Sequence, residues 1–222
     1  MVIIKDLEYQ YERKQRVFGG LNLSIEAGQI VGILGKNGVG KSTLLRCICG
    51  LLHPQAEKIT INGTPVIDRN PSILSNIFLL PEDIYMPDIS AQAYANTYGR
   101  FYSRFDLSQF KKFTNDFEIP YEYRLGEMSY GQKKKTMIAF GLACNTNVLI
   151  MDEPTNDLDF ETIAWLENFL ANYENTVIVV SHDRHFLDAV CTHISDIDFG
   201  KINHYSGNYT FWYESSQLAA KQ

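Results

Sequence analysis

The chain has 222 residues, 45% of them hydrophobic, and a formal net charge of −6 at pH 7. This length and composition suit a folded domain with a substantial core and do not suit a disordered chain. The acidic balance excludes a broadly basic surface that would attract nucleic acid regardless of sequence, so we expect no direct DNA binding.

Membrane spans and secretion signals are not expected either. No apolar run approaches the roughly 20 residues that a membrane-spanning helix needs, and residues 1–6 read as a strand start and not as a signal peptide. The cysteines lie in apolar patterns whose spacing matches no zinc site or disulfide framework; they are Cys47, Cys49, Cys144 and Cys191. We expect buried thiols in a reducing cytoplasm and at most a peripheral role at the membrane.

The first part of the chain alternates between apolar and polar residues in the manner of β-strands. This pattern predicts strands over residues 2–4, 21–25 and 29–34, separated by turns at Gly19-Gly20 and Ala27-Gly28. We interpret it as an antiparallel β subdomain that leads into the motif described next.

A phosphate-binding loop, G-K-N-G-V-G-K-S-T, follows the third strand and precedes an amphipathic helix over 42–48. Its glycines allow the backbone N–H groups to converge on phosphates, and the helix that starts at Lys41 adds its positive end. The sequence therefore predicts a nucleoside triphosphate site, with these candidate residues: Gly35, Lys36, Asn37, Gly38, Val39, Gly40, Lys41, Ser42 and Thr43. Lys41 would lie between the β- and γ-phosphates, and the Ser42 hydroxyl would bind Mg²⁺.

Beyond the loop, Gly50 is expected to cap the helix, and residues 58–62 are expected to form an edge strand before a strand over 76–80. Residues 88–145 change to a helical period rich in aromatic residues, which predicts an inserted helical lobe. We interpret its aromatic stripe as core and not as a base-stacking surface. The basic run 133–135 is interpreted as a solvated helix face and not as a binding patch.

The second half alternates strands with helices. We expect strands over 147–151 and 176–180, helices over 161–170 and 184–190, and short β elements over 194–199 and 201–205. This order predicts a parallel sheet covered on both faces. The expected fold class is α/β, and the chain resembles a P-loop NTPase with a RecA-like parallel sheet. We expect one domain over 1–222 that divides into a core (1–87 and 146–206), the helical lobe (88–145) and a tail (207–222).

Two adjacent carboxylates end the apolar run 148–151. A buried strand delivers residues at its carboxyl end into the crevice where phosphates bind in open α/β sheets. Asp152 should therefore belong to the Mg²⁺ shell, and Glu153 should orient or deprotonate the water that attacks the γ-phosphate.

A third motif, M-S-Y-G-Q at 128–132, precedes a long helix over 133–144. It resembles the signature sequence of ABC ATPases, and the phosphate loop, the signature and the acidic pair occur in the order of that family. The resemblance extends over nearly the whole chain.

The resemblance implies roles for further residues. Tyr11 matches the aromatic position that stacks on adenine, an interaction worth roughly 1–3 kcal/mol, which implies ATP as the nucleotide. The loop 154–159 matches the segment through which paired domains touch, and His182 matches the switch histidine that bonds the γ-phosphate.

The family pairs two domains head to tail, so the resemblance implies a homodimer. Ser129, Gly131 and Gln132 of one copy would reach the ATP bound by the other, and hydrolysis would let the two halves separate. Two positions depart from the family pattern. Glu82 stands where a glutamine is usual and brings a negative charge to the expected metal site, whereas Tyr130 replaces a signature glycine and should be tolerated.

The two halves resemble different subfamilies. Up to about Asp157 the chain is similar to ATP-binding subunits of ABC transporters, which dock on a membrane permease. From about Asp159 onward, residues 181–188 and 207–209 resemble the F subfamily, which acts on ribosomes. Two explanations stay open: a recombinant chain joined near 155–162, or a divergent transporter ATPase.

The leading functional hypothesis is therefore an ATP-hydrolysing subunit of an ABC transporter that works on a separate permease at the inner face of the membrane. The alternatives are a ribosome-binding ABC ATPase and, because of Glu82, a weakly active ATP-dependent switch.

Overall fold

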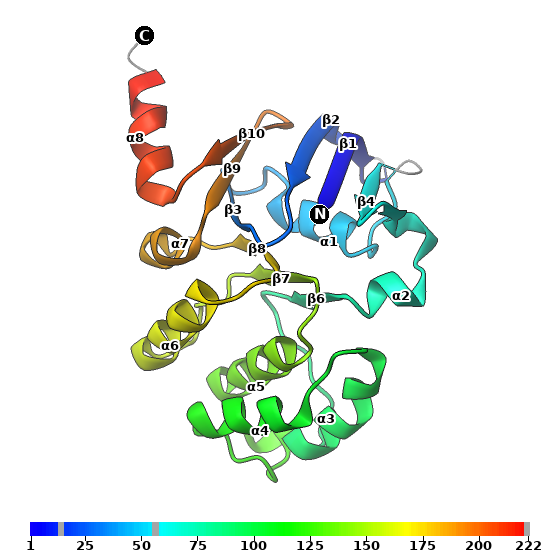
Figure 1. The fold of residues 1–222 in the computed structure, drawn as a ribbon, viewed down its shortest axis with the longest axis vertical. Coiled ribbons are helices and arrows are strands. Elements are labelled where there is room, and N and C mark those ends of the chain that lie inside the picture. The colour runs from blue at the N-terminus through cyan, green and yellow to red at the C-terminus, as the bar shows by residue number, and fades with distance from the viewer. Residues whose placement is uncertain (13–15, 55–57, 220–222) are drawn as a thin grey trace.

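The computed structural model describes residues 1–12, 16–54 and 58–219. Figure 1 shows a central region of strands, a lobe of helices at one end, and the last helix projecting from the opposite end. The last three residues of the predicted tail, 220–222, lie outside the described residues.

The larger sheet of the described chain has six strands in the order β10-β9-β3-β8-β7-β6. All neighbouring strands run parallel except β10, which is antiparallel to β9. In chain order the strands are β3 (Ile30–Gly35), β6 (Ile77–Leu80), β7 (Val148–Asp152), β8 (Thr176–Val180), β9 (His193–Asp198) and β10 (Lys201–Ser206). The predicted α/β class with a parallel sheet is confirmed.

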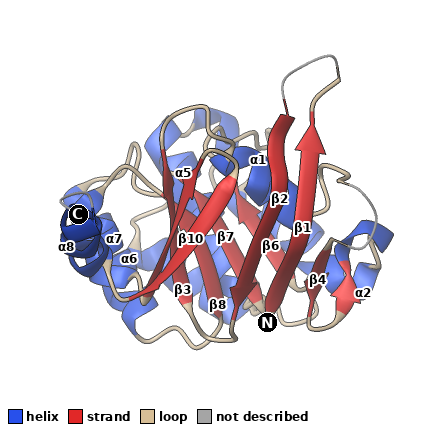
Figure 2. Cartoon of the chain, turned by 90° about the horizontal axis from the view of Figure 1, so that it is seen from above, coloured by secondary structure: helices blue, strands red, loops and turns tan. Residues whose placement is uncertain are grey.

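Apolar residues on both sides of the strands explain why this sheet is buried on both faces. Along β7, Leu149 and Met151 face one hydrophobic core, whereas Val148 and Ile150 face another. The first core includes the helical lobe and helices α6 (Phe160–Ala171) and α7 (Arg184–Val190), and the second includes helix α1 (Lys41–Ile48). Figure 2 shows the strands crossing the centre of the molecule between helices.

A smaller antiparallel sheet covers α1, in the order β2-β1-β4-β5. Its strands are β1 (Val2–Gln10), β2 (Arg16–Ile25), β4 (Ile59–Ile61) and β5 (Thr64–Pro65). The antiparallel subdomain is confirmed, but two details of the prediction are wrong. Gly19 and Gly20 form no turn, because Gly20 (φ 90°) lies inside β2, where the pairing with β1 shifts register. Strand β4 is not at an edge, because the short β5 pairs with its outer side.

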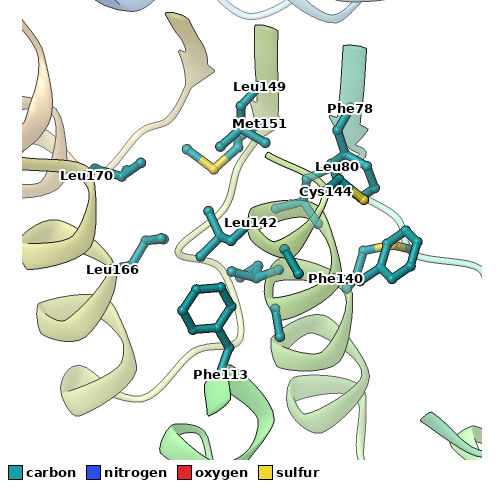
Figure 3. Close-up of a cluster of buried hydrophobic side chains, with 14 of the residues drawn as sticks. Phe78, Leu80, Phe113, Phe140, Leu142, Cys144, Leu149, Met151, Leu166 and Leu170 are labelled. Carbon is teal, nitrogen blue, oxygen red and sulfur yellow. The ribbon is translucent and has the colours of Figure 1, made fainter. Parts of the chain in front are cut away.

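The inserted segment folds as helices whose aromatic side chains turn inward. The helices are α3 (Ala91–Tyr98), η2 (Gly99–Phe101), α4 (Leu107–Asp116), η3 (Leu125–Glu127) and α5 (Tyr130–Ala143). Phe110, Phe113 and Phe117 are buried, which confirms the interpretation of these aromatic residues as core, whereas Phe101 is 62% exposed and departs from it. Figure 3 shows Phe140 and Leu142 of α5 in the same cluster as residues of β6 and β7, so α5 joins the lobe to the sheet.

The remaining elements are η1 (Val66–Asp68), α2 (Pro71–Leu74) and α8 (Tyr209–Ala219). Gly50 has φ 68° and follows α1, as expected of a cap. No helix in the described ranges has the length and apolar character that crossing a membrane requires. All four cysteines are buried free thiols, and burial raises the pKa of Cys47, Cys49 and Cys191 to about 12.

Candidate nucleotide site

The site lies where neighbouring parallel strands end together. Ile33 of β3 and Asp152 of β7 both pair with Val180 of β8, and Leu80 of β6 pairs with Met151. The segments that leave these strands therefore emerge side by side at one edge of the sheet. They surround a cavity of about 410 Å³ whose lining includes Asn37, Gly38, Gly40, Lys41, Ser42, Thr43, Glu82, Asp152, Glu153, Val180 and His182.

The phosphate loop needs its glycines for conformation and for space. Gly38 and Gly40 have φ angles of 81° and 107°, which favour glycine. A Cβ atom on Gly40 would lie 2.5 Å from Cγ1 of Val17. Helix α1 begins at Lys41, whose ammonium group donates to the carbonyl oxygens of Gly35 (2.7 Å) and Lys36 (3.2 Å). The cation is thus held inside the loop that would receive the phosphates.

Ser42 and Asp152 both line this cavity, where the Ser42 hydroxyl acts to lower the pKa of the Asp152 carboxyl. Burial raises the pKa of Asp152 and the neighbouring Glu153 adds to this, whereas Ser42, Arg46 and Lys41 act in the opposite direction. A buried carboxylate of this kind favours a bound cation. One hydroxyl and one carboxylate suit Mg²⁺, which takes its other ligands from phosphates and water.

Glu153 is buried, 4% exposed, and sits in an unusual backbone conformation. Its φ of 49° is in the left-handed region, which costs a non-glycine residue on the order of 1–2 kcal/mol. The backbone N–H of His182 donates to Oε2 at 3.1 Å, and the His182 ring hydrogen-bonds Oε1 through Nδ1. Nε2 of the same ring lies 3.0 Å from Oδ1 of Asn37. His182 therefore links the acidic residue to the phosphate loop.

Glu82 also lines the cavity. Its backbone carbonyl oxygen is hydrogen-bonded by Tyr130, the unusual residue of the signature. The Tyr130 hydroxyl donates to the carbonyl oxygen of Glu82 and accepts from the N–H of Ile84, both at 3.2 Å. The prediction was only that a tyrosine would be tolerated at this position. The structure shows in addition that Tyr130 links the signature helix to the segment that carries Glu82.

The other signature residues do not line this cavity. Ser129 caps α5: its hydroxyl accepts from the N–H of Gln132, and the Gln132 side chain accepts from the N–H of Ser129. Gly131 is in the same first turn. The predicted contact of Ser129, Gly131 and Gln132 with a nucleotide held by a second copy stays a prediction.

Tyr11 lies beside the phosphate loop, with its hydroxyl 3.0 Å from Oγ1 of Thr43 and its ring edge-on to Tyr9. Gly35 and Lys36 line a neighbouring cavity of about 450 Å³, together with Arg184, Asp196 and Trp212. The stacking role of Tyr11 and the phosphate contacts of the loop remain predictions.

The interpretation of residues 133–135 as a solvated face is wrong for Lys134 and Lys135. Lys134 is 0% exposed and donates to the backbone of Glu153, while Lys135 forms an ion pair with Asp159. A sequence signal was available: residues 137–143, which follow these lysines in α5, read M-I-A-F-G-L-A, and the structure buries all of them. Our sequence interpretation assigned all three adjacent lysines to one exposed face, although successive residues of a helix point to different sides.

A phosphate-binding loop at the end of a central parallel strand, with two acids on a neighbouring strand end, defines a P-loop nucleotide hydrolase. The family model described as ABC transporter matches residues 18–156, so the chain belongs to the ABC transporter family, as a nucleotide-binding domain of its ATP-hydrolysing class. The predicted resemblance to ABC ATPases is confirmed.

The relatives of this chain carry names that point to different roles. The chain is 35% identical to an uncharacterized ABC transporter ATP-binding protein, YkpA, of Bacillus subtilis, over 100% of this chain and 46% of that protein. It is 37% identical to the energy-dependent translational throttle protein EttA of Escherichia coli, over 87% of this chain and 34% of EttA. The chain thus spans less than half the length of these relatives. The YkpA match also runs across the proposed joint at 155–162.

Solved structures support the fold. An ATP-binding subunit of an ABC transporter superposes with a TM-score of 0.84 at 21% identity, covering 93% of this chain and 90% of that one. A dimeric ATP-binding cassette in a post-hydrolysis state bound to ADP and phosphate gives 0.79 at 22% identity, covering 93% and 98%.

Proposed function

We propose that this domain binds MgATP in the cavity at the strand ends and hydrolyses it with Glu153 as general base. The observation that carries the proposal is the convergence of Lys41, the Asp152-Glu153 pair and His182, from three segments of the chain, around one cavity. Each has the chemistry that phosphoryl transfer to water requires.

In the proposed mechanism, the loop N–H groups and Lys41 bind the phosphates. Ser42 and Asp152 would hold Mg²⁺, which would supply positive charge beside the phosphate oxygens. The Glu153 carboxylate accepts a proton from water as the water oxygen bonds to the γ-phosphorus and the bond to ADP breaks. His182 already contacts Glu153 and is placed to exchange part of this contact for one with the γ-phosphate.

A second copy is part of the proposal. Ser129 and Gly131 lie at the start of α5, outside the cavity of their own chain. A head-to-tail partner would bring them to the γ-phosphate, together with the positive end of α5. Phosphate release measured with MgATP tests the activity, and light scattering with ATP and without it tests the pairing.

One candidate partner is the ribosome. The relative EttA supports this candidate, since it is named as a translational throttle protein and is 37% identical to this chain. Cosedimentation with ribosomes in the presence of ATP tests this candidate, and free protein in the supernatant at every nucleotide condition would oppose it.

A membrane permease is the second candidate, supported by an apolar groove of about 410 Å³ between α2, β6 and the helical lobe. Phe78, Tyr98 and Phe101 are among its lining residues, and Phe101 is 62% exposed. A segment of a separate permease would dock there and bring the domain to the inner membrane face. Recovery of a membrane protein with the wild-type chain, but not with Phe101→Ser, tests this candidate.

A further inference from the structure

The side chain of Lys134 is buried on the backbone of the residue that we propose as general base. Lys134 is 0% exposed, and its ammonium group donates to the carbonyl oxygen of Glu153 at 2.6 Å. Within the described residues, no carboxylate lies within ion-pair distance of this ammonium. A buried charge is costly, and in the described part of the chain its one direct partner is the Glu153 peptide group.

This contact completes the restraint of the Glu153 backbone. The N–H of Glu153 donates to the carbonyl oxygen of Val180 at 2.8 Å. On the other side, its carbonyl oxygen accepts from Lys134 and, at 3.3 Å, from the N–H of Asn156. The left-handed φ of 49° needs such support, since a strained residue keeps its conformation only when its surroundings fix it.

Lys134 is part of a wider contact between the first turn of α5 and the loop 153–159. Lys135 forms an ion pair with Asp159, and the backbone at Gly131 is so close that an added Cβ would lie 2.8 Å from the carbonyl oxygen of Asp157. The helix that starts with the signature residues therefore rests directly on the loop that carries Glu153.

The charge of Lys134 also fits its surroundings. Burial lowers the pKa of Lys134, whereas the carboxylates of Asp157, Glu153, Glu82 and Asp152 act in the opposite direction. Among these acids a cation reduces mutual repulsion, which a neutral residue of the same size would not do.

We propose that Lys134 is a positioning residue for ATP hydrolysis: it fixes the Glu153 peptide from the signature helix, so that the carboxylate keeps its aim at the attacking water. This inference rests on the proposed function. It also links the two half-sites of one chain, because the helix that would touch the partner's ATP through Ser129 is the helix that holds Glu153.

The test compares Lys134→Met with Lys134→Arg and with the control Lys133→Met, the adjacent and more accessible lysine. We expect Lys134→Met to lower kcat by about 10- to 100-fold, as for a displaced reacting group, with KM for ATP changed less than about twofold. Lys134→Arg should recover part of the rate, because it keeps a cationic donor, and Lys133→Met should behave as wild type.

A double variant separates positioning from general loss of structure. In single-turnover phosphate release, adding Lys134→Met to Glu153→Gln should slow the reaction less than about twofold further, because Lys134 acts through Glu153. If Lys134→Met does not fold, Lys134→Gln, which removes the charge and shortens the reach, takes its place. The proposal is overturned by an unchanged kcat in these variants, or by losses that multiply with Glu153→Gln. A wild-type chain without turnover would instead overturn the proposed function.

Discussion

His182 holds both carboxylate oxygens of Glu153, one through its ring and the other through its backbone N–H. The two residues are 29 positions apart in the sequence, and the pairing of Asp152 with Val180 brings their strand ends together. Because the same ring reaches Asn37 of the phosphate loop, a single side chain links that loop to Glu153.

We therefore expect His182→Ala to lower the turnover of ATP by about 100-fold, in the range of a lost positioning or proton-transfer partner. Affinity for ATP should change little, because the phosphate loop and Lys41 remain. The measurement is steady-state phosphate release beside nucleotide titration. His185→Ala is the matched control, since His185 is exposed and contacts Glu167 outside the cavity. Equal rates for the two variants would contradict the role of His182.

Replacing Glu153, the proposed general base, gives the sharpest separation of binding from chemistry. Glu153→Gln keeps the size of the side chain but removes its ability to accept a proton, so we expect turnover to fall by about 10²- to 10⁴-fold while ATP still binds. The variant should accumulate as an ATP-bound dimer, measured by size-exclusion chromatography with ATP and without it. Glu122→Gln, on the exposed surface of the lobe, is the control. A normal rate for Glu153→Gln would remove this residue from its assigned role.

The sequence predicted the central strands well, because they are long apolar runs and the phosphate loop marks where one of them ends. Residues 176–180 were predicted as a strand and form β8. The first strand was predicted over 2–4 only, but β1 continues to Gln10 beside β2. The polar residues in its second half obscured the strand pattern. Gly19 and Gly20 were misread as a turn, because glycine permits a bulge within a strand as readily as a turn between strands.

The sequence predicted which residues belong to the site but not how their side chains contact one another. Motif spacing predicts that Lys41, Asp152 and His182 belong to one crevice, since each follows a predicted parallel strand. It cannot predict that His182 contacts Glu153 or that Lys134 reaches the Glu153 carbonyl. Those contacts depend on the strand order and on the rotation of α5, and both are set by tertiary packing.

The ammonium group of Lys41 should contribute to the affinity for ATP. Lys41→Ala removes the cation that the loop holds beside the carbonyls of Gly35 and Lys36, and a hydrogen bond with charge assistance is worth about 1.5–3 kcal/mol. We expect ATP affinity to fall by roughly 10- to 100-fold, which corresponds to that energy, in isothermal titration calorimetry with MgATP. Lys112→Ala, an exposed lysine of the lobe, should bind as wild type, and equal affinities would argue against the assigned phosphate contact.

Tyr130→Phe tests whether the hydroxyl at this signature position supports the Glu82 segment. The substitution removes two hydrogen bonds, to Glu82 and Ile84, and leaves the ring. Since such bonds contribute about 0.5–1.5 kcal/mol each and this hydroxyl is partly exposed, we expect a loss of about 1 kcal/mol in the free energy of unfolding. Urea denaturation measures it, with Tyr123→Phe, at an exposed position, as the control. A loss no greater than that of Tyr123→Phe would contradict this support.

A pair of histidines joins the last two strands of the large sheet. The rings of His193 and His204 stack with centroids 5.2 Å apart and an interplanar angle of 6°. Gln29 donates to Nε2 of His193 at 3.3 Å, and Ser195 lies 2.7 Å from Nδ1 of His204. Burial lowers the pKa of both rings, and the charge of His193 lowers the pKa of His204 further.

These shifts predict a loss of stability in mild acid. Because the pKa of both histidines is lower in the folded chain than the ordinary value of about 6.5, the unfolded chain takes up protons first as the pH falls. Their contribution is therefore complete above about pH 6.5 and is lost as the pH falls through the folded-state values. A loss of about 1 kcal/mol lowers the Tm of a domain of this size by roughly 2–4 °C, and we expect at most this change between pH 7 and 5. The double variant His193→Gln, His204→Gln should flatten the dependence of Tm on pH. An unchanged slope would mean that other groups cause the acid sensitivity, because the two stacked rings are the titrating groups that the variant removes.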